Sequence, residues 1–173
     1  MNKRVYLRAL EPADYKVSIE WRRDEQIWDM LGGPRYFVSE AYEKSWVEKT
    51  IFESKDVKLA ICLVENDKYI GNVYMTDINV INRSCHSHVL IGDKSCWGKG
   101  YAGEALRLAI AYMFNERNIE RIQANILEEN TQSLRMHEKC GYKIEGLMRK
   151  AVYKGGKYHN QYITALIKDD YSE

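Results

Sequence analysis

The sequence has little of several features that mark particular classes of protein. It contains only two prolines among 173 residues and shows no repeat or low-complexity tract, which argues against a disordered or fibrous chain. Lys and Arg number 26 against 25 Asp and Glu, so the charge provides no general attraction to nucleic acid or to anionic membranes. We therefore expect its partners to be recognised by a local site.

The four cysteines show no Cys-x-x-Cys pairing, and no histidine lies at ligand spacing from them, so neither a metal site nor a disulfide framework is indicated. The longest clearly apolar run, Leu59 to Val64, is too short to span a bilayer. The amino terminus lacks the apolar core of a signal peptide. These absences predict a cytoplasmic protein with reduced thiols.

Hydrophobic residues make up 45% of the chain, which suits a packed core in a single domain spanning residues 1–173. Alternating apolar residues predict strands, and apolar residues at helical spacing behind polar caps predict helices. The predicted strands are 5–10, 57–65, 69–77, 86–91, 121–126, 142–145 and 161–168. The predicted helices are 11–31, 39–54, 102–117 and 130–140, the first ending at Gly32-Gly33-Pro34.

A glycine-rich loop, Trp97-Gly98-Lys99-Gly100-Tyr101-Ala102, leads directly into the predicted helix at 102–117. Glycines allow a tight turn that exposes backbone N–H groups, and the helix adds unpaired donors and the positive end of its dipole. The loop is therefore predicted to bind a phosphate or pyrophosphate. A P-loop for a nucleotide triphosphate is excluded, because five residues separate Gly92 from Gly98 and no Ser or Thr follows Lys99.

A second block, from Asn130 to Tyr142, reads Asn-Thr-Gln-Ser-Leu-Arg-Met-His-Glu-Lys-Cys-Gly-Tyr. One helix and one strand separate it from the glycine loop, and a βαβα arrangement brings both to the same edge of a sheet. Ligands of α/β folds usually bind at such an edge, beside the carboxyl ends of strands.

Together the two blocks resemble the GNAT superfamily of N-acetyltransferases, in the branch similar to ribosomal-protein-alanine and spermidine/spermine acetyltransferases. That family carries a Gln/Arg-x-x-Gly-x-Gly/Ala loop and an Asn-x-x-Ser-x-x-x-Tyr-Glu-Lys-x-Gly-Phe block. The resemblance implies an α+β (α/β GNAT-type) fold. Its mixed, mostly antiparallel sheet has about six or seven strands, is splayed at the fourth and fifth strands, and is flanked by about four helices.

The resemblance also implies an acetyl-CoA donor. The backbone of 98–102 would hold its diphosphate, Trp97 would form a wall beside it, and Lys99 would add charge. Edge groups near Leu90 and Ile91 would pair with the pantetheine arm, and Asn130 would hydrogen-bond the same arm. No metal is expected.

Two departures from the family pattern concern proton transfer. His137 stands where the family usually carries the Tyr that protonates the leaving thiolate, and a histidine, with a pKa near 6.5, can serve as an acid or a base. His86 stands near a position where similar sequences often have Glu, and alternation puts it on the same face as His88. His86 is the candidate base, with His88 or water as alternatives.

The expected function is transfer of an acetyl group to a primary amine by direct attack in a ternary complex. By resemblance, Asp29 and Tyr36 would line the acceptor site from the helical side and Tyr158 from the tail hairpin. A protein N-terminus, a polyamine and an amino sugar all remain open as acceptors. The alternative is a noncatalytic acyl-CoA binding module, because the usual Tyr and Glu are missing. A homodimer is a further expectation.

Overall fold

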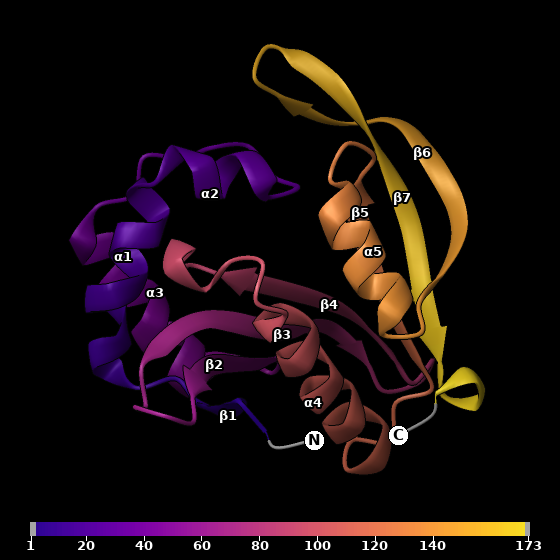
Figure 1. Ribbon diagram of the computed structural model, residues 1–173, viewed down its shortest axis with the longest axis horizontal. Coiled ribbons are helices and arrows are strands. Elements are labelled where there is room, and N and C mark those ends of the chain that lie inside the picture. Colours follow the sequence, from indigo (N-terminus) through magenta and orange to yellow (C-terminus); the bar gives the residue numbers. More distant parts are fainter. Residues whose placement is uncertain (1–2, 172–173) are drawn as a thin grey trace.

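The computed structural model describes residues 3–171, which form one seven-stranded sheet with helices on both of its faces (Figure 1). The strands are β1 Val5–Ala9, β2 Val57–Leu63, β3 Tyr69–Asn79, β4 Ser84–Ile91, β5 Arg121–Leu127, β6 Lys143–Lys154 and β7 Lys157–Ile167. The helices are α1 Tyr15–Arg23, α2 Glu25–Met30, α3 Glu40–Glu53, α4 Tyr101–Asn115 and α5 Thr131–Lys139. The mixed sheet and its splay match the predicted α+β architecture, with five α-helices in the described residues rather than about four.

The strand order is β1-β2-β3-β4-β5-β7-β6. Strands β1 to β4 form an antiparallel meander, and β5, β7 and β6 form a second antiparallel group. The two groups meet where β4 and β5 pair in parallel. The chain crosses between these two strands through α4, as a parallel connection requires.

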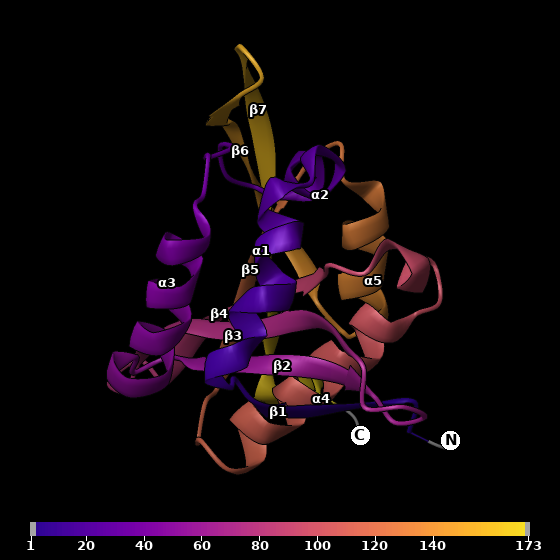
Figure 2. The same cartoon turned by 90° about the vertical axis from the view of Figure 1, so that its left-hand side faces the viewer.

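Two helical layers cover the sheet, with α1 and α3 on one face and α4 on the other (Figure 2). Four residues of α4 recur at helical spacing and are at most 1% exposed, as the predicted core stripe requires: Leu106, Ala109, Ile110 and Met113. They join the main core beneath β1 to β5. A smaller apolar cluster, with Trp21 and Ile27, lies on the opposite face.

The predicted first helix is divided in the structure. Asp24 has an extended backbone, and its carboxylate accepts a hydrogen bond from the Gln26 N–H, so it ends α1 and caps α2. The tail hairpin is longer than predicted, because β6 and β7 continue to a tight turn at Gly155 and Gly156. Figure 1 shows this hairpin bending over towards α2.

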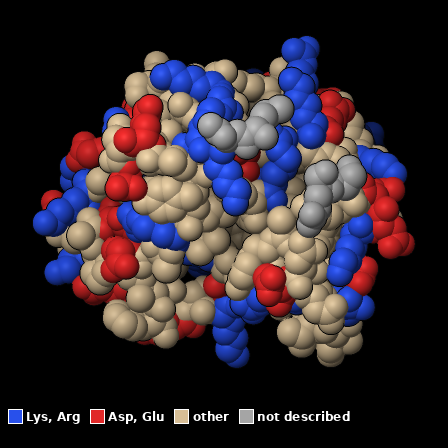
Figure 3. All heavy atoms as spheres, turned by 60° about the horizontal axis from the view of Figure 1, so that its bottom comes forward, with Lys and Arg blue, Asp and Glu red and all other residues tan. Residues whose placement is uncertain are grey.

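Acidic and basic side chains are interspersed on the face drawn in Figure 3, in keeping with their nearly equal numbers. The four cysteines are buried free thiols. No helix among residues 3–171 is long and apolar enough to cross a bilayer.

Candidate active site

The site begins where β4 and β5 separate. They pair only from Ser84 to His86 on β4 and from Arg121 to Gln123 on β5, whereas the other neighbouring strands described are antiparallel and paired over most of their length. Beyond His86 the two strands diverge. Tyr142 fills the base of the opening, where its hydroxyl lies 2.8 Å from the Ser87 Oγ.

A groove of about 510 Å³ occupies the open end between these strands. Val89, Leu90 and Ile91 line it from β4, and the glycine loop and the first turns of α4 and α5 form its other walls. Of the residues predicted to bind the donor, this groove brings together Leu90, Ile91, Trp97, Gly98, Gly100, Tyr101, Ala102 and Asn130. Lys99 does not line it.

The glycine loop has the backbone of an anion cradle. Gly98 and Gly100 have φ of 72° and 82°, in the left-handed region that glycine adopts without strain, and Gly100 is the N-cap of α4. A Cβ on Gly98 would meet no atom within 4 Å, so glycine is required there by backbone angle rather than by space. The first turn of α4 presents its unpaired N–H groups at this point.

Side chains around the cradle support it in two ways. The Glu104 carboxylate accepts hydrogen bonds from the backbone N–H groups of Arg4 and Val5, while the Arg4 guanidinium donates to the Lys99 carbonyl at 3.1 Å. These contacts join the loop to the start of β1.

Three cationic side chains that sequence reasoning missed line the groove and favour an anionic ligand: Arg107, Arg135 and Lys139.

Trp97 and Asn130 are both engaged in structural contacts. The Trp97 indole N–H donates to the Ile91 carbonyl at 2.7 Å, which occupies one acceptor at the end of β4. Asn130 caps α5 by accepting from the Ser133 N–H, and its Nδ2 donates to the Met30 carbonyl. A side-chain contact from Asn130 to the pantetheine arm would therefore compete with these bonds.

His137 lies on the last turn of α5, 4% exposed, and is not among the residues that line the groove. Its Nδ1 is 2.9 Å from the Ser133 carbonyl, which can only accept, so Nδ1 carries the proton and Nε2 does not. Nε2 is buried and has no partner among the described residues. Burial lowers the pKa of His137, which keeps the ring neutral near pH 7.

A second, smaller cavity of about 100 Å³ lies on the opposite face of the sheet, beneath α1, α2 and α3. It shares four lining residues with the groove: Ile27, Leu31, Val89 and Leu90. The two cavities therefore border the same side chains beside β4, beyond its last pairing with β5. We call this region the junction.

His88 lines the smaller cavity, whereas His86 does not. Both lie on the same face of β4, as predicted, but His86 is beside Thr76, two residue pairs further from the junction than His88. The His88 Nε2 is 3.1 Å from the Thr76 Oγ1. Burial, and then the neighbouring His86, lower the pKa of His88, so its ring is neutral near pH 7.

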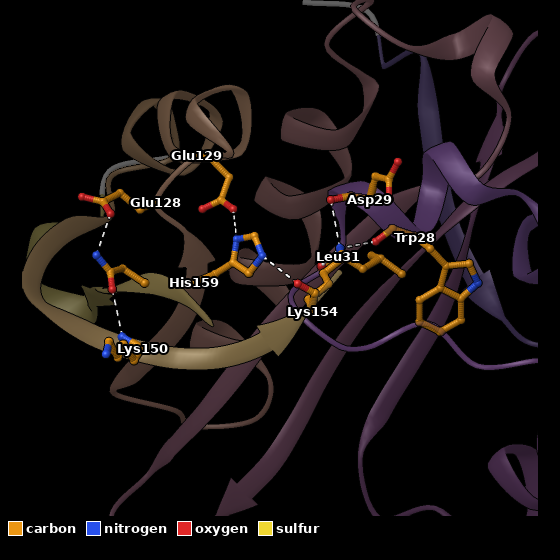
Figure 4. A network of polar contacts seen from close by, with 9 residues as sticks. Trp28, Asp29, Leu31, Glu128, Glu129, Lys150, Lys154 and His159 are labelled. Atoms are coloured by element: carbon orange, nitrogen blue, oxygen red, sulfur yellow. Dashed lines mark hydrogen bonds and ion pairs between the residues drawn. The ribbon is translucent and has the colours of Figure 1, made fainter. Parts of the chain in front are cut away.

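The short helix α2 forms the roof at the junction, and Lys154 of β6 contacts its carboxyl end (Figure 4). Lys154, at the end of β6, donates its Nζ to the carbonyls of Trp28, Asp29 and Leu31 at 2.5, 3.0 and 2.8 Å. A cation at the carboxyl end of a helix offsets the partial negative charge of its unpaired carbonyls. His159 on β7 bridges the Lys154 carbonyl and the Glu129 carboxylate.

The three residues predicted to bind the acceptor line neither cavity. Tyr36 is 61% exposed and packs edge-on against Trp28. Tyr158 is 62% exposed and contacts Tyr153 at the hairpin tip. Asp29 contributes its backbone carbonyl to Lys154. Their predicted contacts with an acceptor stay predictions.

Sequence reasoning did not find the polar residues of the smaller cavity, apart from His88 as a minor alternative. These residues are Ser18, Arg22, Glu43, Asn72, Tyr74 and His88. They come from α1, α3, β3 and β4, and no motif links them. Glu43 could have been suspected only from its place in the first turn of α3, where acidic residues are common for helix-dipole reasons. No cluster of three or more metal-ligating side chains occurs within residues 3–171.

Comparison with known proteins agrees with this geometry. Residues 4–143 match the acetyltransferase (GNAT) domain family. A probable N-acetyltransferase of Bacillus subtilis, YjcK, is 28% identical, with 97% of this chain and 96% of the relative covered. The spermidine N(1)-acetyltransferase of Vibrio cholerae is 26% identical, with 92% and 91% covered.

Among solved structures, the spermidine N-acetyltransferase of Vibrio cholerae in complex with CoA and spermine superposes with a TM-score of 0.90. It is 24% identical and covers 98% of this chain and 99% of its own, so the likeness establishes the fold. The glycine cradle, the splayed strands and the family match agree, and the chain belongs to the GNAT family as an acetyl-CoA-dependent N-acetyltransferase.

Proposed function

We propose that the acetyl group is transferred at the junction of the two cavities, beside Val89 and Leu90. The observation that carries this proposal is the set of four residues that both cavities share. The donor would enter the groove between β4 and β5, and the primary amine would enter the cavity beneath α1 to α3. The two reactants then meet without any covalent enzyme intermediate.

The groove supports binding of acetyl-CoA by its shape and charge. The diphosphate would bind the N–H groups of residues 98–102, and Arg107, Arg135 and Lys139 would add positive charge. The pantetheine arm would run along the open edge of β4 near Leu90. Because the Ile91 carbonyl already accepts from Trp97, we expect the N–H and C=O groups before it to make the strand-like contacts.

His88 is the proposed general base. The amine nitrogen forms a bond to the thioester carbonyl carbon, the C–S bond breaks, and the proton lost by the amine passes to the His88 ring. A neutral imidazole is needed for this step, and the lowered pKa of His88 supplies it near pH 7. His86, the residue expected from the sequence, has no comparable access to the cavity.

His137 remains a candidate acid for the leaving thiolate. Its unprotonated Nε2 must take up a proton before it can donate one, and burial makes the resulting imidazolium a stronger acid than usual. The amine's proton passes to His88 on the opposite face of the sheet, so His137 would take its proton from solvent before the step and donate it to the thiolate sulfur as the C–S bond breaks.

The amine acceptor is tested by supplying acetyl-CoA with a panel of amines and measuring release of free CoA thiol. The panel includes spermidine, which relatives of this chain acetylate, together with amino sugars and peptides with free N-termini. Turnover on any of them excludes the noncatalytic acyl-CoA binding alternative. Tight binding of acetyl-CoA without acetylation of any amine would contradict the proposal.

We also propose that the enzyme acts in the cytoplasm, since its four cysteines are free thiols. The expected homodimer stays a prediction. Light scattering on the purified chain tests it directly.

A further inference from the structure

The polar lining of the acceptor cavity indicates the class of amine that it accepts. We infer that the acceptor carries a carboxylate or carbonyl oxygen close to its amine, as an α-amino acid unit does, and that polyamines are poor acceptors. This inference rests on the proposed function, because it assumes that the cavity beneath α1 to α3 receives the amine.

The carboxylate that lines this cavity is already paired with two neighbouring side chains. Glu43 is 1% exposed, its Oε1 accepts from the Ser18 hydroxyl at 2.6 Å, and its Oε2 lies 3.3 Å from the Arg22 Nε. Glu43 is the only Asp or Glu among the described residues that line the cavity. A cationic substrate would therefore find no uncommitted carboxylate on these walls.

The Arg22 guanidinium has two hydrogen-bond donor nitrogens without a partner among the described residues of the same cavity. Its Nε binds Glu43, while Nη1 and Nη2 make no hydrogen bond to any residue from 3 to 171. The guanidinium lies over the rings of Trp28 and Trp46, at 5.8 and 5.4 Å from their centroids, which favours this position of the side chain. A guanidinium with two unused nitrogens suits a carboxylate or carbonyl oxygen.

Tyr74 adds a second donor beside Arg22. Burial raises the pKa of Tyr74, so its hydroxyl keeps its proton, and its oxygen makes no hydrogen bond within the described chain. Tyr74 pairs directly across the sheet with His88. An α-amino acid unit could therefore present its oxygen to Arg22 and Tyr74 and its amine to His88, a few bonds away.

The acidic residues around the cavity do little to offset the positive charges of a polyamine. Near the cavity, Glu25 on α2 is paired with Arg35, and Asp24 is paired with Lys94. Asp56 and Asp77 act on the charge of His88 but do not line the cavity. Arg22 and Glu43 together carry no net charge, so the walls give a polyamine cation no electrostatic attraction. The cavity is thus matched to an amine whose second group is an oxygen acceptor.

The test compares kcat/KM for acetylation of spermidine with that for free amino acids, their amides and short peptides. Free amino acids offer a carboxylate and their amides a carbonyl oxygen, so comparing these two distinguishes the two oxygen acceptors. Short peptides show whether the amine at the end of a chain is accepted as well as that of a free molecule. We expect the best of them to exceed spermidine by at least about tenfold, the effect of one charge-assisted hydrogen bond. Spermidine or another polyamine as the best acceptor would overturn the inference while leaving the proposed function intact.

Substitutions test the role of Arg22 through the ratio between the two classes of acceptor. Arg22→Met should lower kcat/KM for the amino-acid acceptor by about 100-fold and raise the relative rate with spermidine, because Glu43 is then unpaired. The affinity for acetyl-CoA should not change. Arg23→Met is the matched control, since Arg23 binds only Glu20 on the outer surface of α1.

Tyr74→Phe is a milder second variant, which removes one oxygen atom and leaves Glu43 paired. It should lower kcat/KM for the amino-acid acceptor about tenfold, with little change for spermidine. An unchanged ratio between acceptors in both variants would refute the inference. If no amine is acetylated at all, the proposed function fails and the inference fails with it.

Discussion

At the scale of single residues, two histidines with lowered pKa values approach the site from opposite faces of the sheet. His88 faces the acceptor cavity from β4, and His137 lies behind the groove on α5. Both rings are neutral near pH 7 because burial disfavours the imidazolium. The two rings therefore lie on different faces of the sheet, as the proposed roles of base and acid require.

His88→Gln should lower kcat by about 10²-fold to 10⁴-fold, the usual contribution of a general base. A group with a lowered pKa is deprotonated above that pKa. After the rates of both enzymes are corrected for ionisation of the amine, native activity should be constant near neutral pH and should fall as pH drops below the ordinary histidine range. The variant should not show this fall. His86→Gln is the comparison variant, and an equal loss there would reassign the base to His86.

His137→Phe separates chemistry from binding, because phenylalanine keeps the edge-on packing against Tyr142. If His137 protonates the thiolate, kcat should fall by about 10²-fold or more while the affinity for acetyl-CoA stays the same. The defect should shrink with a thioester donor whose thiol is more acidic. Normal turnover in this variant would remove His137 from the mechanism.

The glycine cradle predicts a binding defect from one added methyl group. Gly100→Ala places a Cβ at a φ of 82°, which costs about 1–2 kcal/mol unless the loop changes shape. We expect the Kd for acetyl-CoA to rise roughly tenfold in calorimetry. Gly146→Ala, on β6 in open space and without a positive φ, is the matched control and should bind normally.

At the scale of secondary-structure elements, the central feature is the way the β6–β7 hairpin and α5 hold α2. Lys154 and Asn130 together contact the carbonyls of Trp28, Asp29, Met30 and Leu31. A six-residue helix has little stability of its own, so these contacts fix the position of Ile27 and Leu31 at the junction. The hairpin therefore supports the helix that covers the junction of the two cavities.

Lys154→Met should therefore affect the acceptor more than the donor. Loss of three charge-assisted hydrogen bonds should raise the KM for the amine about tenfold and lower the free energy of unfolding by about 1–3 kcal/mol. The Kd for acetyl-CoA should change little. Lys150→Met, on the same strand with no side-chain contact to α2, is the control. A lower free energy of unfolding with an unchanged KM for the amine would mean that Lys154 does not position α2.

At the scale of the whole molecule, the sheet and the crossover agree with what the family resemblance implied, and the residues expected around the donor, Lys99 excepted, line one groove. Gly98 to Ala102 and Asn130 to Tyr142 are local patterns whose geometry depends on neighbouring residues, so they could be interpreted without coordinates. The long tail hairpin was predicted too short, because the alternation near Lys150 is interrupted by a register shift in β6.

The acceptor cavity could not be predicted in the same way. Arg22, Glu43, Tyr74 and His88 come from four elements, and each is unremarkable in its local sequence. Only the packing of α1 and α3 on the sheet brings them together. The family resemblance implies Asp29, Tyr36 and Tyr158 as acceptor residues, and in the structure they lie outside both cavities.

The most direct test of the whole account is a crystal structure with CoA and an accepted amine bound together. We expect the diphosphate on the N–H groups of Gly98 to Ala102, the sulfur atom beside Val89 and Leu90, and the amine nitrogen next to His88 beneath α2. A CoA sulfur outside the opening between β4 and β5, or an amine bound away from the cavity beneath α1 to α3, would contradict the account.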